Sequence, residues 1–390
     1  MKSNLFYGAL EQSRLEGGVV ERASVPLFQM ARWETFDMLR ALAMVFVFLY
    51  HYAGFLSPLT QGAPWLDAME ELVLQLGSIG TNLFLLLAGL FVARSVARDN
   101  FRYEAFLARR VIRIYPPYLL VVLAALLFWL LFPAYAKFRP GATPFSVFWE
   151  NLFLIPGLFP QRPALTVTWT LSWIMAAYVV LPLPLIALRR LAERAWWRIA
   201  ILSGVLLVYV VLACYTSLGS PRVGYLLAGC VIFELVTIAP VDYAGHRRMA
   251  RMLLLGGTAL LLRIAVQTAG AWGVYEAARR VLSTSLGLCG LSLLAVAAFI
   301  AQLLHPLHYY QFPWNPIRQL GRIGFSFYLL HGPVTKLFAF QVLYPLPRLW
   351  DKPYAGWLVM PVCFLAAGAA SAALFFWIER PLQRLGKAYF

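Results

Sequence analysis

Three ionisable side chains, Asp37, Arg40 and His51, lie in the first long apolar stretch of the chain, FDMLRALAMVFVFLYH. If this stretch is helical, the steps from Arg40 to His51 turn three circles plus about 20°, which places both side chains on one face, about 16 Å apart along the axis. Asp37, close before Arg40, joins that face. A neutral imidazole can take a proton from a hydroxyl near neutral pH, and a guanidinium binds anions. An interfacial Asp–Arg pair with a separate, hydrogen-bonded histidine explains the same pattern, so both interpretations stay open.

A second basic cluster occurs in FLARRVIRIYPPY, which contains Arg109, Arg110 and Arg113. Arg110 and Arg113 would be neighbours on a helix, and guanidinium groups pair bidentately with phosphate oxygens. We expect Pro116 and Pro117 to halt this basic segment just before an apolar span. The pattern predicts a phosphate site at the membrane surface, although the preference of basic residues for cytoplasmic loops would also produce it.

Further polar groups fall within other apolar stretches. His331 lies in GRIGFSFYLLHGP, about ten residues into its span, with Tyr328 one helical turn before it. Asn82 lies near the middle of another stretch, GTNLFLLLAG. Three polar groups, His51, His331 and Asn82, at one depth on three helices indicate a shared cavity, or else three separate helix-packing hydrogen bonds.

The elements that must position these residues are membrane helices. Of the 390 residues, 61% are apolar and 13% are charged, and the mean hydropathy is +0.71. A spanning helix needs about 20 apolar residues, and such windows recur along the chain. We therefore expect an all-α, polytopic integral membrane protein with about ten transmembrane helices, near residues 38–57, 73–95, 117–136, 168–188, 199–215, 222–239, 252–270, 281–304, 321–344 and 355–377. The expected domains are a cytoplasmic tail at 1–36, a membrane domain at 37–382 and a second cytoplasmic tail at 383–390.

The basic residues concentrate in alternate loops, such as the one with Arg189, Arg190, Arg194 and Arg198. This bias places both termini in the cytoplasm and predicts a multi-pass protein of a bacterial inner or plasma membrane. It also accounts for the net charge of +16, so we expect no nucleic-acid partner. The four cysteines form no metal-spacing motif, and we expect no metal.

One connection, 137–167, contains an apolar segment at 145–159 that is too short to span a membrane and is bounded by prolines. It is predicted to lie at the outer interface or to re-enter the membrane.

Taken in order, these motifs resemble those of the acyltransferase-3 family of membrane O-acyltransferases, which modify sugars and lipids. The first apolar stretch is similar to the family's D-x-x-R-A…H opening, GTNLFLLLAGLFVARS to its G-x-D-x-F-F…S-G pattern, and FLARRVIRIYPPY to its R-R-x-x-R-x-x-P segment. WTLSWIMAAYVVLPL, LGRIGFSFYLLHGP and WIERPL follow, so that the resemblance extends from about residue 36 to 382. Asn82 and Ile174 stand where the family commonly has carboxylates, and Ala88 replaces a usual serine.

The resemblance implies transfer of an acyl group, with acetyl favoured, from cytoplasmic acyl-CoA to a hydroxyl of an extracytoplasmic glycan or glycolipid. In that interpretation His51 is the general base, or carries the acyl group as an acyl-histidine. Arg40, oriented by Asp37, lines the donor entrance, and the CoA phosphates are held by Arg109, Arg110 and Arg113.

The acceptor side is implied to include Tyr328 and His331, which would bind the acceptor or stabilise the oxyanion. Trp169, Ser172 and Asn82 would line it, although an interfacial tryptophan and a packing serine explain Trp169 and Ser172 equally well. Glu379 and Arg380, in WIERPL, are interpreted as a structural ion pair at the membrane edge.

The expected partners are the lipid bilayer, acyl-CoA, the acceptor and a glycan-assembly machinery. A transporter or flippase is the alternative, because intramembrane histidine and arginine also suit the movement of a lipid-linked glycan.

Overall fold

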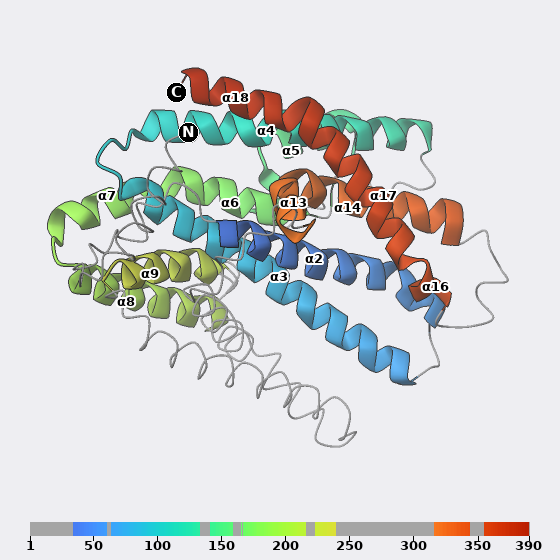
Figure 1. Ribbon diagram of the computed structural model, residues 1–390, viewed down its shortest axis with the longest axis horizontal. Coiled ribbons are helices and arrows are strands. Elements are labelled where there is room, and N and C mark those ends of the chain that lie inside the picture. Colours follow the sequence, from blue (N-terminus) through green and yellow to red (C-terminus); the bar gives the residue numbers. More distant parts are fainter. Residues whose placement is uncertain are drawn as a thin grey trace, which may run out of the picture. The chain divides into compact units, whose positions relative to one another are not determined.

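A computed structural model describes residues 34–60, 64–132, 141–158, 165, 167–215, 223–238, 316–343 and 355–389, all within one compact unit, Trp33–Phe390. Every regular element among these residues is a helix (Figure 1). In chain order they are α2 (Glu34–Thr60), α3 (Pro64–Val96), α4 (Tyr103–Leu131), α5 (Pro144–Leu152), η3 (Ile155–Gly157), α6 (Thr168–Val180), α7 (Pro182–Leu191), α8 (Ala195–Tyr215), α9 (Gly224–Ile238), α13 (Pro316–Arg322), α14 (Gly324–Phe338), η6 (Ala339–Leu343), α16 (Ala355–Leu358), α17 (Met360–Leu374), η7 (Phe375–Glu379) and α18 (Arg380–Tyr389).

Six helical runs in the described residues are long and apolar enough to cross a membrane. They are Leu39–Leu56, Leu76–Val96, Tyr103–Leu131, Thr168–Leu191, Ala195–Ala213 and Ala355–Gly386, and Gly224–Leu235 is a shorter apolar helix. The predicted all-α, polytopic membrane class is therefore confirmed. The predicted spans 252–270 and 281–304 lie outside the described residues, so the number of ten remains a prediction, as does the placement of the termini.

Helix α2 contacts α3, α13 and α14, and thereby joins segments from both ends of the chain (Figure 1). Its Phe48 and Tyr52 pack into a buried apolar cluster with Phe327 of α14. Gly321 of α13 lies so close to α2 that an added Cβ would overlap the backbone carbonyl of Asp37. Small residues at helix contacts permit this close approach in membranes. The turn that carries Asp37 and Arg40 is thus held directly against α13.

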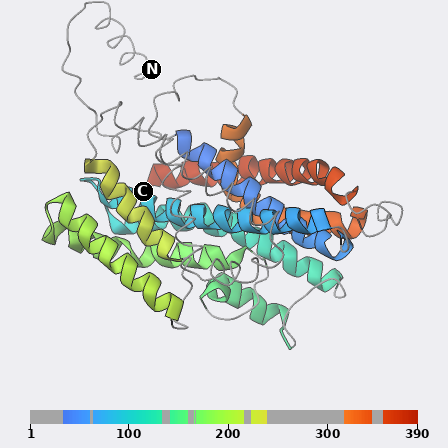
Figure 2. The ribbon, with the colours of Figure 1, turned by 90° about the horizontal axis from the view of Figure 1, so that it is seen from below.

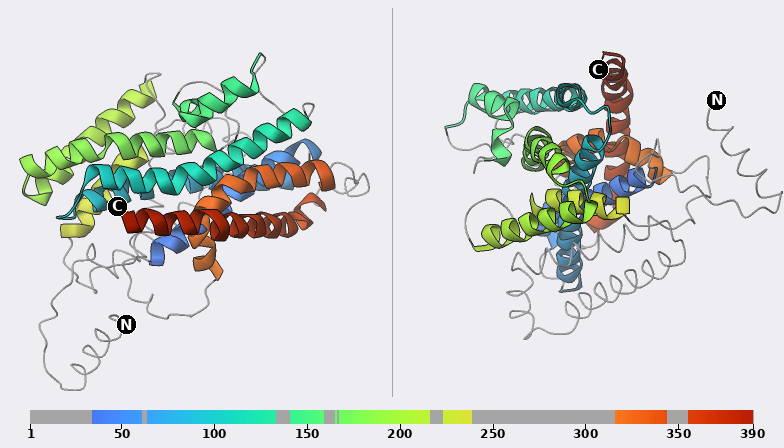
Figure 3. Two further views of the ribbon diagram at one scale, coloured as in Figure 1. Left: turned by 90° about the horizontal axis from the view of Figure 1, so that it is seen from above. Right: turned by 90° about the vertical axis from the view of Figure 1, so that its left-hand side faces the viewer.

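Helix α9 contacts both α3 and α8 (Figures 2 and 3). Gly89 of α3 lies against the Leu226 carbonyl of α9, and Gly229 of α9 lies against the Leu86 carbonyl of α3. Each glycine faces the other helix of the pair, so the two backbones pack together without an intervening side chain.

Helix α4 runs without interruption through Pro116 and Pro117 and includes the arginines that precede them. The prediction that the two prolines halt the basic segment before the span is wrong. A proline removes one N–H donor and crowds the carbonyl four residues back, but membrane bundles tolerate this where neighbouring groups satisfy the freed carbonyls. Arg109, Arg110 and Arg113 therefore project from the apolar span itself.

The short apolar segment of the connection 137–167 forms α5 and η3. Thr143 begins α5 with a capping box to Ser146, which satisfies two backbone donors. Asn151, fully buried, accepts hydrogen bonds from the Tyr118 hydroxyl at its backbone oxygen (3.0 Å) and at Oδ1 (3.2 Å). Tyr118 lies near the middle of α4, so this contact supports the re-entrant interpretation of the segment.

At the other end of the chain, α18 lies alongside α4, and Gly386 is in contact range of Ile112 (Figure 1). The domain boundary expected at residue 382 falls within α18, and the extent of the C-terminal tail remains a prediction.

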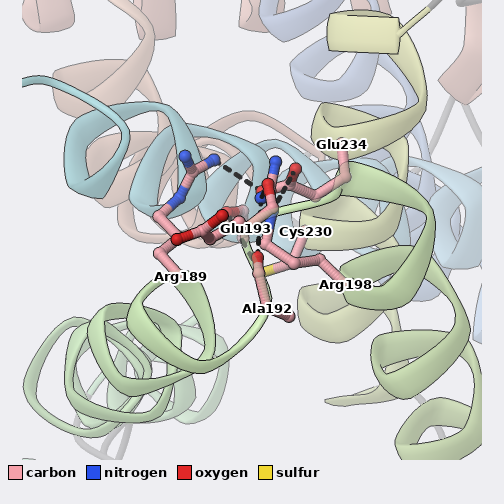
Figure 4. Close-up of polar contacts among 7 residues, drawn as sticks. Arg189, Ala192, Glu193, Arg198, Cys230 and Glu234 are labelled. Carbon is pink, nitrogen blue, oxygen red and sulfur yellow. Dashed lines mark hydrogen bonds and ion pairs between the residues drawn. The ribbon is translucent and has the colours of Figure 1, made fainter.

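Two arginines expected in a cytoplasmic loop are paired with Glu234 of α9, a residue with 2% exposure (Figure 4). Arg189 contacts its Oε1, and Arg198 Nε donates to its Oε2 at 2.9 Å. Arg198 also donates to the carbonyls of Ala192 and Glu193, which follow the end of α7. This cluster ties the α7–α8 turn to α9.

Candidate active site

The centre of the candidate site is a pair of histidines from two helices. His51 of α2 and His331 of α14 have ring centroids 5.2 Å apart, and His331 is 1% exposed. His331 Nδ1 lies 3.0 Å from the carbonyl oxygen of Phe327. A carbonyl can only accept, so Nδ1 carries the proton and, in the neutral ring, Nε2 keeps a lone pair.

This Nε2 atom has no hydrogen-bond partner among the described residues. A buried polar atom is normally satisfied by protein, water or ligand. His331 Nε2 is therefore suited to accept a hydrogen bond from a hydroxyl group that enters beside His51.

Tyr328 connects the histidine pair to the start of α6. Its ring centroid lies 6.2 Å from that of His331, and its hydroxyl donates to the carbonyl of Val167, the N-cap of α6. Trp169 and Ser172 follow in the first turns of α6. Ser172 is buried and its Oγ donates to the Thr168 carbonyl at 3.0 Å, so this hydroxyl is used within the helix.

Gly157 of η3 packs against the same turn, because an added Cβ there would overlap the Trp169 carbonyl and the Ser172 side chain. The structure thus brings Tyr328, Trp169 and Ser172 to one end of α6, and the α5–η3 segment covers that end.

Asn82 is buried on α3, with 3% exposure. Phe84, two residues further along, has its ring 5.7 Å from that of Tyr328. α3 therefore reaches the same region.

The first turn of α2 and the first half of α4 form a second, cationic part of the site. Asp37 Oδ1 accepts from Arg40 Nη1 at 2.8 Å, as the shared face predicts. The Arg40 guanidinium lies over the ring of Phe91, 4.7 Å from its centroid. Arg40 is also within electrostatic range of Arg110 and Arg113 of α4. The two basic motifs found in the sequence therefore meet in space.

Arg110 is held between two aromatic rings, with its guanidinium carbon 5.1 Å from the Phe106 centroid and 4.8 Å from that of Tyr178. Cation–π contacts of this kind orient a guanidinium without neutralising it. Arg109 is exposed on the same helix. Among the residues described, no group of three or more His, Cys, Asp or Glu is arranged to hold a metal ion.

Sequence reasoning missed Tyr118, Tyr178 and the partner of Glu379. Tyr118 and Tyr178 lie in apolar runs, where a tyrosine can equally mark the membrane interface. The interpretation of Glu379 and Arg380 as an ion pair is wrong, because Glu379 pairs with Arg113, at 3.6 Å, and the Arg380 guanidinium lies over Phe376. Adjacent residues on a helix point in different directions, so the sequence already indicated that Glu379 and Arg380 would not pair with each other.

Comparison with known proteins places these features in a family. A family model described as an acyltransferase domain matches residues 33–378. Acyltransferase MdmB of Streptomyces mycarofaciens is 27% identical to the chain over 338 residues, which cover 80% of this chain and 82% of that protein. No solved structure gives a match. The family match includes α2, α4 and α14, which carry the histidine pair and the cationic cluster, and the chain therefore belongs to the acyltransferase-3 family of membrane acyltransferases.

Proposed function

We propose that the protein transfers an acyl group, with acetyl favoured, from cytoplasmic acyl-CoA to a hydroxyl of an extracytoplasmic glycan or glycolipid. The observation that carries this proposal is the contact between His51 and the buried His331, whose Nε2 has no partner among the described residues. His51 lies on the same helix, α2, as the Asp37–Arg40 pair.

The donor would enter at the cationic cluster. Arg110 and Arg113, with Arg109 beside them, are suited to the phosphates of CoA, and Arg40, oriented by Asp37, lines the same entrance. His51 follows Arg40 by eleven positions on α2, which corresponds to about 16 Å along the axis. A pantetheine arm has about this length, so it can carry the thioester from the phosphates to the histidines.

In the transfer step His51 takes the proton of the acceptor hydroxyl as its oxygen attacks the thioester carbonyl. The new C–O bond forms, the C–S bond breaks, and the imidazolium returns the proton to the leaving thiolate, which yields the ester and free CoA. Because His331 Nδ1 donates to Phe327, its neutral Nε2 accepts rather than donates. This supports a role for His331 in binding the acceptor and argues against one as an N–H donor to the oxyanion.

The acceptor side would be formed by Tyr328, Trp169, Ser172 and Asn82, with the α5–η3 segment next to them. The Tyr328 and Ser172 hydroxyls already donate within the protein, so they are suited to shape this side and to accept hydrogen bonds from a sugar.

The test is turnover of labelled acetyl-CoA by purified protein in detergent, with water or an added glycan as the acceptor. His51→Ala should lower the rate by about 10²–10⁴-fold, the usual contribution of a positioned acid–base group. Tyr50→Phe is the matched control, since the Tyr50 ring contacts that of His51, 5.0 Å between centroids, without reaching His331 in any described contact.

Both variants must elute as monodisperse protein before their rates are compared. A well-folded His51→Ala protein with the wild-type rate contradicts the role of His51. A transporter has no reason to consume the thioester in detergent, where no compartments exist.

A further inference from the structure

Glu379 is a fully buried carboxylate at the end of η7 on which α4, α14 and α18 converge. Ser326 Oγ of α14 donates to its Oε2 at 2.7 Å, and Gln383 Nε2 of α18 donates to its Oε1 at 2.8 Å. The same Oε1 lies 3.6 Å from Nε of Arg113 on α4. Both oxygens are therefore engaged, and the charge is opposed by one arginine.

Burial of a carboxylate is costly unless an opposite charge and hydrogen bonds compensate it. Ser326 and Gln383 supply the hydrogen bonds, and Arg113 supplies the charge. If Glu379 had only a structural role, the strongest arrangement would be a bidentate pair, in which two N–H groups of the guanidinium donate to the two carboxylate oxygens. Here Glu379 meets Arg113 through Nε, and no described residue is hydrogen-bonded to its two Nη groups.

The side chain of Arg113 is 33% exposed, whereas that of Glu379 is 0% exposed. Arg113 also lies within electrostatic range of Arg40 and Arg110, so its guanidinium is repelled by two like charges. Without an anchor, a long side chain in such a field would move away from the cluster and sample many rotamers. Glu379 opposes this repulsion from the buried side.

Backbone geometry also marks this position. Glu379 ends η7, a π-helical segment that joins α17 to α18. Single widened turns of this kind inside α-helices are frequently found at functional sites.

We propose that Glu379 is a positioning residue for donor binding, which holds Arg113 by its Nε edge so that the two Nη groups face a phosphate of acyl-CoA. Glu379 itself does not touch the donor and acts through Arg113. This inference rests on the proposed function, because it takes CoA as the ligand of the cationic cluster.

The experiment measures CoA binding by calorimetry, together with KM and kcat for acetyl-CoA, on detergent-purified full-length protein. The variants are Glu379→Gln, Glu379→Asp, Arg113→Ala and the Glu379→Gln/Arg113→Ala double variant. Arg380→Ala is the matched control, because it removes a charge from the adjacent residue, whose guanidinium lies over Phe376.

Arg113→Ala should weaken CoA binding by about tenfold or more, as expected for loss of hydrogen bonds to a charged group. Glu379→Gln keeps the size and one acceptor oxygen for Gln383, and its amide nitrogen can donate to the Ser326 hydroxyl, which reverses that hydrogen bond. It should raise Kd and KM by about three- to tenfold with little change in kcat, within the range of coupling in such networks. The double variant should bind no more weakly than Arg113→Ala alone, and Glu379→Asp should recover part of the affinity. Arg380→Ala should bind as the wild type does.

The inference is overturned if Glu379→Gln binds CoA with the affinity of Arg380→Ala while Arg113→Ala binds CoA more weakly. The donor site would then include Arg113 but would not depend on Glu379. It is also overturned if the losses in the double variant multiply, or if Glu379→Gln lowers only thermal stability and active fraction. If Arg113→Ala binds CoA with wild-type affinity, the donor site itself is contradicted, and the role of Glu379 is contradicted with it.

Discussion

The chemistry of each histidine in the site depends on what its ring contacts. His331 donates from Nδ1 to Phe327, which leaves Nε2 as an acceptor, whereas His51 contacts the rings of Tyr50 and His331. The two imidazoles are therefore not equivalent. His331 has a defined tautomer in its neutral form, and this defined acceptor is what we expect an incoming hydroxyl to bind.

This difference can be tested with His331→Asn. The amide nitrogen of asparagine can keep the donation to the Phe327 carbonyl, but the substitution removes Nε2. We expect acetyl-CoA turnover in the presence of an acceptor to fall at least about tenfold, which corresponds to about 1.4 kcal/mol of barrier. The melting temperature in detergent should change little.

Thr335→Val is the comparison for His331→Asn. Thr335 is buried one turn further along α14, and its hydroxyl donates to the His331 carbonyl rather than to the ring. Its loss should affect stability more than rate. Wild-type turnover in folded His331→Asn would show that the unpartnered nitrogen is not used.

At the scale of helices, close backbone contact acts together with the burial of large side chains. Between helices in a membrane there is little hydrophobic driving force, because lipid is as apolar as the side chains, and association depends on close packing. Gly89 and Gly229 provide it for α3 and α9, and Gly321 provides it for α13 and α2. These contacts position the helices that carry the basic and polar groups.

Substitution of glycine by alanine should therefore have opposite effects at two positions. Gly89→Ala forces a methyl group into the Leu226 carbonyl of α9 and should destabilise the protein by about 1–3 kcal/mol, as overpacking does. Gly204→Ala in α8 meets nothing within 4 Å and should be neutral or stabilising by up to about 1 kcal/mol, because alanine favours the helix. Thermal unfolding in detergent measures both. Equal shifts for the two variants would contradict the close α3–α9 contact.

At the scale of the whole molecule, α4 relates the cationic cluster to the ends of the chain. Its first half carries Arg109, Arg110 and Arg113, and the C-terminal helix α18 returns to that half, where Gly386 lies near Ile112. The other end of α4, at Leu131, precedes the α5–η3 segment. If the arginines mark the cytoplasmic side, the C-terminus shares that side, and the connection after α4 lies on the opposite one.

Topology reporters can examine this arrangement. A reporter joined after Phe390 should behave as cytoplasmic, and one inserted at Gly141 should behave as external. Gly141 is exposed, has φ of 75° and would have open space around an added Cβ, so an insertion there should be tolerated. A reporter at Asn100, in the exposed turn between α3 and α4, is the second cytoplasmic position. If the reporters at Gly141 and Phe390 both indicate the same side of the membrane, the spans must be reassigned.

Several features follow from the sequence alone. Apolar composition and windows of about 20 residues determine a helical membrane protein. In lipid the backbone N–H and C=O groups must bond to one another, and an α-helix satisfies them within a single segment. Helical periodicity places Asp37 and Arg40 within one turn, and their ion pair follows from it. The ordered motifs also indicate the family to which the chain belongs.

Which helices meet was decided only by the tertiary structure. His51 with His331, Arg113 with Glu379, and Tyr118 with Asn151 are contacts between distant parts of the chain. In a membrane protein the buried and the lipid-facing sides of a helix are both apolar, so periodicity does not reveal which side faces a neighbour. Local rules also fail where neighbouring helices can override them, as Pro116 and Pro117 inside α4 illustrate. The buried charge of Glu379 acquires its partner from another helix, because a residue adjacent along the chain points away from it.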